Sequence, residues 1–136
     1  MTDNPVFLRR SLNAVQAGEF LVLDTLRWPT LFGSGLRIYF ARSGSDPKTP
    51  VGAGVSISTK QRIAGQVIAM GKAPAGDGAV EMDLGDQPVT LPSCTPESEL
   101  FDDLNVMVAQ RHTETAQNVA DWWQYHVTHH GLSGVV

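Results

Sequence analysis

The sequence predicts an α+β protein: an antiparallel, β-rich N-terminal region followed by a strand–helix unit that begins an α/β domain. In the first 91 residues, short apolar runs are separated by turns rich in glycine and proline. Such spacing is typical of an antiparallel sheet folded into a small sandwich or barrel. Beyond residue 104 the pattern changes to one strand and one amphipathic helix, as in the first half of a parallel βαβ unit.

The first predicted element is a short helix or helical turn within residues 5–18. Leu8, Leu12 and Val15 recur there at helical spacing, and Gly18 is suited to end a helix. Strands are then predicted at residues 19–26, 36–42, 51–58, 62–70, 79–84 and 87–91. Together they are enough for one small antiparallel domain.

Alternation and turn residues justify these strands. Leu36, Ile38 and Phe40 alternate with residues that face the other way, which is the period of a half-buried strand. The proline and glycines of residues 28–35 require the backbone to turn there. Pro88 favours an edge strand, because proline cannot donate a backbone hydrogen bond. Residues 43–50 and 71–78 are predicted loops.

Gly52 and Gly54 invite comparison with phosphate-binding loops. Their spacing does not follow the pattern of a dinucleotide-binding loop, and they precede a strand rather than a helix. We therefore interpret them as residues of a strand to which another backbone segment approaches closely.

The predicted organisation has three parts. Residues 1–95 form the β-rich domain, residues 96–104 a linker, and residues 105–136 the start of a βαβ unit. Within the last part we expect a strand at 105–110, a turn at 111–114 and a helix at 115–130. Gly131 ends the helix, and Val135 and Val136 begin a second strand. Because two residues cannot complete a parallel pair, we expect the chain to be the N-terminal piece of a longer protein.

The predicted helix is amphipathic. Thr113 is expected to cap it and Glu114 to interact favourably with the positive end of its dipole. One side carries apolar residues at spacings of three and four, which predicts a buried stripe. Its members are Ala116, Val119, Ala120, Trp123 and Val127.

Composition excludes several classes of protein. The formal net charge is −4 and the basic residues are scattered, so a nucleic-acid binder is not expected. No segment has the length of a membrane span or the layout of a signal peptide, which predicts a cytoplasmic protein. Cys94 is the only cysteine. It lies in a turn bracketed by prolines, and we interpret it as structural.

Arg111 and Glu114 are the candidate ligand-binding residues. They lie where a strand leads into a helix, and in open α/β sheets ligands bind at such places. Arg111 could bind an anion or a planar base, and Glu114 could accept a hydrogen bond from a ribose hydroxyl or an exocyclic amine. An ordinary capped turn is equally compatible with these residues.

Histidines suggest a second kind of site. His126 and His130 are four residues apart and share a helix face, as two zinc ligands do. His112 is the nearest candidate for a third ligand. Histidines also interact favourably with the negative end of a helix, so this pattern does not by itself predict a metal site.

Three stretches of the last part resemble glycosyltransferases of families 2 and 92. They are Val106-Met-Val-Ala-Gln-Arg-His-Thr-Glu114, Val119-Ala-Asp-Trp-Trp-Gln-Tyr-His126 and Gly131-Leu-Ser-Gly-Val-Val136. Members of these families open with a strand, a basic–Asn–acidic turn, a helix bearing Trp-x-x-Tyr-His, a glycine and a second strand. Here His112 and Thr113 replace the single asparagine.

The resemblance implies a GT-A fold that binds a nucleotide-sugar with a divalent metal, Mn or Mg. It assigns nucleotide binding to Arg111 and Glu114. The family's Asp-x-Asp metal motif and its catalytic base are not present in the 136 residues, so this piece is not expected to transfer sugar alone. The β-rich domain would be an extension for docking, acceptor binding or covering the catalytic sheet.

Two other functions remain open at the level of sequence. The first is a non-enzymatic β-rich binding or interaction module, with the aromatic helix closing the sheet or contacting a partner. The second is a small metal-dependent enzyme that uses His112, His126 and His130.

Overall fold

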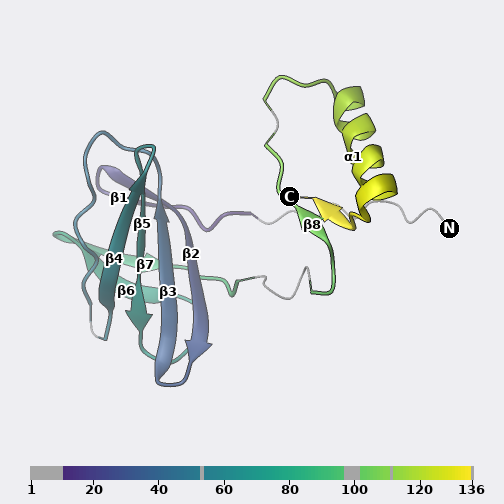
Figure 1. Cartoon of the computed structure of the whole chain (residues 1–136). Coiled ribbons are helices and arrows are strands. Elements are labelled where there is room, and N and C mark those ends of the chain that lie inside the picture. Colours follow the sequence, from purple (N-terminus) through teal and green to yellow (C-terminus); the bar gives the residue numbers. More distant parts are fainter. Residues whose placement is uncertain (1–10, 53, 97–101, 111, 136) are drawn as a thin grey trace. The chain divides into compact units, whose positions relative to one another are not determined.

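A computed structural model describes residues 11–52, 54–96, 102–110 and 112–135 (Figure 1). The fold is α+β, with mostly antiparallel sheet and one C-terminal helix. The chain divides into two compact units, Met1–Pro96 and Glu97–Val136. The division falls at the start of the predicted linker.

The first unit contains a five-stranded antiparallel sheet in the order β1-β2-β3-β5-β4. A second sheet consists of the hairpin β6–β7. The strands are β1 (Val15–Ala17), β2 (Phe20–Thr30), β3 (Gly33–Phe40), β4 (Ser56–Ile63), β5 (Gln66–Ala73), β6 (Val80–Leu84) and β7 (Gln87–Leu91).

Both sheets contribute to one hydrophobic core, as in a small sandwich. The alternation predicted for β3 is confirmed, because Leu36, Ile38 and Phe40 are fully buried. β5 adds Val67, Ala69 and Ala73, and the hairpin supplies Val80, Met82, Leu84, Val89 and Leu91. Burial of these apolar side chains is the main source of stability of the unit.

The helix predicted within residues 5–18 is wrong for its described part. Val15–Ala17 is strand β1, which pairs with Phe20–Val22 of β2 through a tight turn. Gly18 has a φ of +59° and provides the left-handed residue of this turn rather than a helix end. The hydrogen bonds that β1 gains by pairing with β2 outweigh the weak preference for a helix that the spacing of the apolar residues indicated. Residues 1–10 lie outside the described residues.

The strand predicted at residues 62–70 is in fact a hairpin. β4 ends at Ile63, and Ala64 and Gly65 turn with φ values of 49° and 85°. Two consecutive positive φ values are typical of the tight turns that match the twist of paired strands. β5 then runs to Ala73, three residues into the predicted loop at 71–78.

Proline does not end β2, which continues to Thr30. The backbone groups of Thr25 and Arg27 point away from β3 and toward Cys94. The carbonyl of Thr25 accepts from the N–H of Cys94 at 3.1 Å, and the N–H of Arg27 donates to the carbonyl of Cys94 at 3.0 Å. Because backbone groups two residues apart point to the same side, Pro29 also faces away from β3. Its lack of an N–H group therefore costs no hydrogen bond to β3.

Gly52 shows the close approach expected at the glycine pair, but the strand predicted at 51–58 is misplaced, because β4 begins at Ser56. The segment before β4 is joined to β6 by two bonds between Val51 and Asp83, of 3.0 and 2.6 Å. A Cβ atom on Gly52 would lie 3.1 Å from the carbonyl oxygen of Glu81. The glycine thus allows this segment to lie against the second sheet.

Arg27 forms a buried polar centre in the first unit, and its side chain is only 9% exposed. Its Nη2 atom donates to the carbonyl of Pro74 at 2.7 Å, and Nη1 donates to the carbonyl of Ala79 at 3.3 Å. Its Nε atom donates to the hydroxyl of Ser34 at 3.3 Å, which in turn donates to the carbonyl of Gly76. The guanidinium thereby fixes the loop that connects β5 to β6.

The second unit contains β8 (Val106–Met107), α1 (Ala116–His130) and β9 (Gly134–Val135). β8 and β9 pair in parallel, so strand, helix and strand have the predicted order and orientation. The first strand is shorter than the predicted 105–110. Gly131 ends the helix with a φ of 61°, as predicted.

Two expectations about the helix are wrong. Thr115, not Thr113, is the N-cap, and its hydroxyl accepts from the backbone N–H of Asn118 at 3.2 Å. The predicted apolar stripe is not buried: α1 contains no buried residue, and Val119 is 38% exposed. Two paired strands of two residues each are too small to cover a helix of 15 residues.

We expect the substitution Arg27→Met to lower the free energy of unfolding of the first unit by about 2–4 kcal/mol, because the hydroxyl of Ser34 and the carbonyls of Pro74 and Ala79 lose their donor. The free energy of unfolding is measured by urea denaturation monitored by circular dichroism. Arg62→Met is the matched control. Arg62 is exposed and pairs with Asp46, so its loss should cost less than about 1 kcal/mol. Equal effects of the two variants would contradict the role of Arg27.

Gly71→Ala is expected to destabilise the first unit by about 1–3 kcal/mol, as overpacking does. The new Cβ would lie 2.8 Å from Cα of Ile57, beside the bulge of β4. Backbone atoms cannot move aside as the end of a flexible side chain can. Gly44→Ala is the control, since its Cβ would meet nothing within 4 Å. Thermal melting of both variants checks the difference, and a stable Gly71→Ala protein would disprove the close packing.

Candidate functional site

The candidate site is the connection between β8 and α1, residues 108–115. It begins at the carboxyl end of β8 and leads to the amino end of α1. Every described residue of the connection is exposed, so a ligand has access to it. In α/β sheets this is where helix N–H groups and strand ends together bind anionic ligands.

Glu114 lies in this connection, directly before the N-cap residue Thr115. Its Oε2 atom accepts a hydrogen bond from the backbone N–H of His112 at 2.8 Å. The carboxylate therefore folds back onto its own turn and holds it in shape. Arg111, the other predicted nucleotide-binding residue, lies outside the described residues.

Asn105 organises the opposite end of the unit. Its Nδ2 atom donates to the carbonyls of His130 and Gly131, at 3.1 and 3.4 Å. Its backbone bonds to Ser133, whose N–H donates to the Asn105 carbonyl at 2.8 Å. The side chain thus satisfies carbonyls at the end of α1 that have no partner within the helix. Sequence reasoning missed this role, because the partners lie 25 and 26 residues away.

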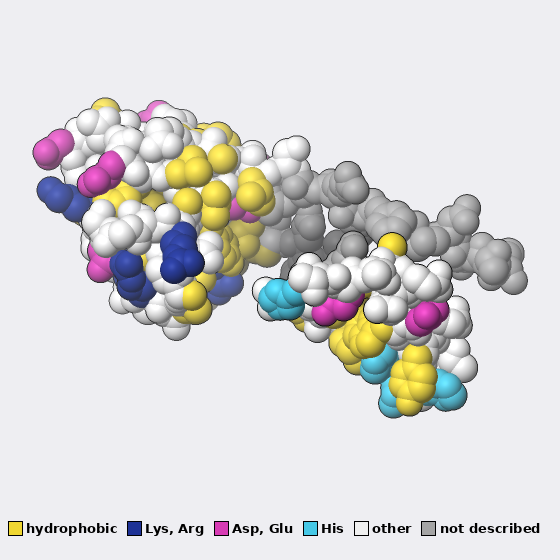
Figure 2. Space-filling model, turned by 90° about the horizontal axis from the view of Figure 1, so that it is seen from above, with side chains coloured by type: hydrophobic (Ala, Val, Ile, Leu, Met, Phe, Trp, Pro, Cys, Tyr) yellow, Lys and Arg dark blue, Asp and Glu magenta, His cyan; other side chains and the backbone are white. Residues whose placement is uncertain are grey.

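The histidines of α1 lie among aromatic rings. The ring of His126 is 4.6 Å from Trp122 and 5.0 Å from His130, measured between centroids. Tyr125 contacts His129 at 4.6 Å. Figure 2 shows histidine and hydrophobic side chains side by side on the surface of this unit. The rings form an aromatic surface near the end of the helix.

A metal centre built on His112, His126 and His130 has no support in the described ranges. Within residues 11–52, 54–96, 102–110 and 112–135, no group of three His, Cys, Asp or Glu side chains could hold a metal ion. His112 lies before the helix, whereas the other two lie near its end.

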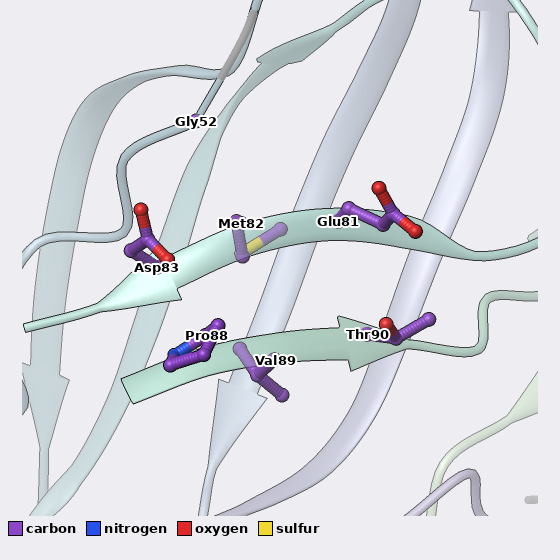
Figure 3. Close-up of a pocket in the computed structure, with 7 residues that line it drawn as sticks. All are labelled: Gly52, Glu81, Met82, Asp83, Pro88, Val89 and Thr90. Carbon is purple, nitrogen blue, oxygen red and sulfur yellow. The ribbon is translucent and has the colours of Figure 1, made fainter. Parts of the chain in front are cut away.

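The second sheet carries a shallow depression of about 470 Å³. Glu81 and Asp83 of β6 and Pro88 and Thr90 of β7 lie around it, together with Gly52 (Figure 3). Two carboxylates without a cation in the lining would repel a nucleotide diphosphate. We therefore do not assign nucleotide binding to this depression.

No helix in the described part of the chain is both long and apolar enough to cross a membrane. Cys94 is half-buried, and its backbone pairs with β2. This arrangement agrees with a structural role for the residue.

We expect Asn105→Ala to destabilise the C-terminal end of α1 by about 1–2 kcal/mol, the contribution of two hydrogen bonds. Amide hydrogen exchange in the last two turns of the helix measures the loss. Asn118→Ala is the control, because only the backbone of Asn118 takes part in the N-cap. If amide exchange is unchanged in Asn105→Ala, the two hydrogen bonds from the Asn105 side chain do not stabilise the helix end.

Comparison with known proteins adds no relative: no protein-family model, curated protein or solved structure matches the chain significantly.

Proposed function

We propose that this chain is the N-terminal region of a cytoplasmic glycosyltransferase that uses a nucleotide-sugar donor, and that it is not catalytic by itself. The observation that carries the proposal is the parallel pairing of β8 and β9 across α1. A parallel pair joined by a helix is the building unit of nucleotide-binding α/β sheets. The resemblance of residues 106–136 to glycosyltransferases favours a nucleotide-sugar as the ligand.

The exposed apolar side of α1 also supports this function. Val119 and the half-buried Trp123 and Val127 lie on the side that a sheet covers in α/β domains. Additional parallel strands beside β8 and β9 would bury them. In this proposal the enzyme supplies those strands, together with its metal ligands and catalytic base, from residues outside the described ones.

The turn then has a defined role. The carboxylate of Glu114, held by the N–H of His112, would accept a hydrogen bond from a ribose hydroxyl or an exocyclic amine of the base. Arg111 would contribute positive charge for an anionic ligand, which the helix dipole at the amino end of α1 also favours. The first unit, with its own core, would serve as an accessory domain.

The proposal is tested on the full product of the encoding gene, which should contain an acidic metal motif downstream of residue 136. Titration calorimetry with UDP- and GDP-sugars and Mn²⁺ should detect saturable binding. Glu114→Gln should weaken it about tenfold, which corresponds to losing one hydrogen bond to a charged group.

Asp121→Asn is the matched control, because Asp121 lies on α1 outside the turn and accepts from Gln117. Its affinity should equal that of the unchanged protein. A gene product without the metal motif, or one that binds neither nucleotide-sugar, would sink the proposal. Self-sufficient cooperative folding without nucleotide binding would instead favour a β-rich interaction module.

A further inference from the structure

The turn of the β2–β3 hairpin carries two large apolar side chains in water. Leu31 is 88% exposed and Phe32 is 96% exposed. The turn lies at the lower end of the first unit in Figure 1, beyond the hairpin's own strands. Tight turns usually contain glycine, asparagine, aspartate or proline. Two adjacent, large and exposed apolar residues are therefore unusual in a turn, which makes this tip a candidate binding surface.

Next to the tip, one face of the sheet carries an aromatic side chain and two basic side chains. Trp28 pairs with Gly35, which in turn pairs with Lys72, so the three lie on one face across β2, β3 and β5. The indole of Trp28 occupies the space that a side chain at Gly35 would fill. The guanidinium of Arg37 lies 5.9 Å from the centre of the Trp28 ring. An aromatic ring with a polar N–H group thus lies beside two cations.

We propose that this tip, Leu31 and Phe32, inserts into the interface of a lipid bilayer containing anionic headgroups. Leu31 follows Trp28 by three positions, just beyond the end of β2, a distance of about 10 Å in extended chain. Interfacial apolar groups enter the bilayer by about 5–10 Å. Insertion of the tip therefore brings Trp28 to the level of the headgroups, where tryptophan is enriched, and Lys72 and Arg37 to the phosphates.

A bilayer fits this tip better than a protein partner does. The tip is convex and consists of two residues, whereas a stable protein interface buries roughly 1,200 Å² or more. A bilayer needs no complementary shape. Arg37 and Lys72 are positively charged, although the chain as a whole has a net charge of −4. The β5–β6 loop also contains one acidic residue, Asp77. The inference does not depend on the proposed function.

The test is flotation of the chain with vesicles of phosphatidylcholine, with and without phosphatidylglycerol. The unchanged protein should float with the mixed vesicles. The double variant Leu31→Ser and Phe32→Ser should partition at least about tenfold more weakly, because it loses two large apolar side chains. Lys72→Glu should weaken binding to the mixed vesicles but not to pure phosphatidylcholine.

Ile63→Ser provides the matched control, because Ile63 is 58% exposed at the β4–β5 hairpin. It should float like the unchanged protein, and thermal melting should show that all variants are folded. The proposal fails if the unchanged protein does not float, or if the double variant floats equally well. It also fails if the tip mediates self-association that the double variant abolishes and vesicles do not affect, because the apolar partner is then a second copy.

Discussion

The first unit depends on the burial of one cation. A guanidinium has five N–H donors and no acceptor, so Arg27 needs hydrogen-bond acceptors where it is buried. The structure provides neutral oxygens of Ser34, Pro74 and Ala79, which come from β3 and from the loop between the two sheets. Meeting this requirement fixes the course of the loop, and the loop in turn determines where β6 begins. The packing of the two sheets therefore follows from a polar constraint as well as from the apolar core.

The position of Arg27 itself results from an irregularity in β2. In the register of the two strands, Val22 pairs with Phe40 and Thr25 pairs with Ile38. Two residues of β2 but only one of β3 therefore lie between these pairs. This bulge changes which side chains point inward. Without it, Leu26 and Trp28 would face the core. With it, Thr25 and Arg27 do so, while Trp28 lies on the outer face over Gly35.

The second unit is held together mainly at the ends of its helix. An isolated helix of 15 residues is marginal in water, and none of the side chains of α1 is fully buried. Thr115 caps its beginning, while Gly131 and Asn105 satisfy its last carbonyls. These local bonds place the exposed connection with Glu114 at a defined position, ahead of the first turn.

Sequence alone determined the features that arise from local periodicity. The alternation in β3, the two short strands β6 and β7, the helix end at Gly131 and the parallel order of the last unit were all predicted, because each depends on neighbouring residues. Glu114 was likewise selected from its place between a strand and a helix. Only the tertiary structure decided the bulge in β2, the inward position of Arg27 and the clamp by Asn105. Those features depend on partners tens of residues away, and no local pattern encodes which distant carbonyls will lack a donor.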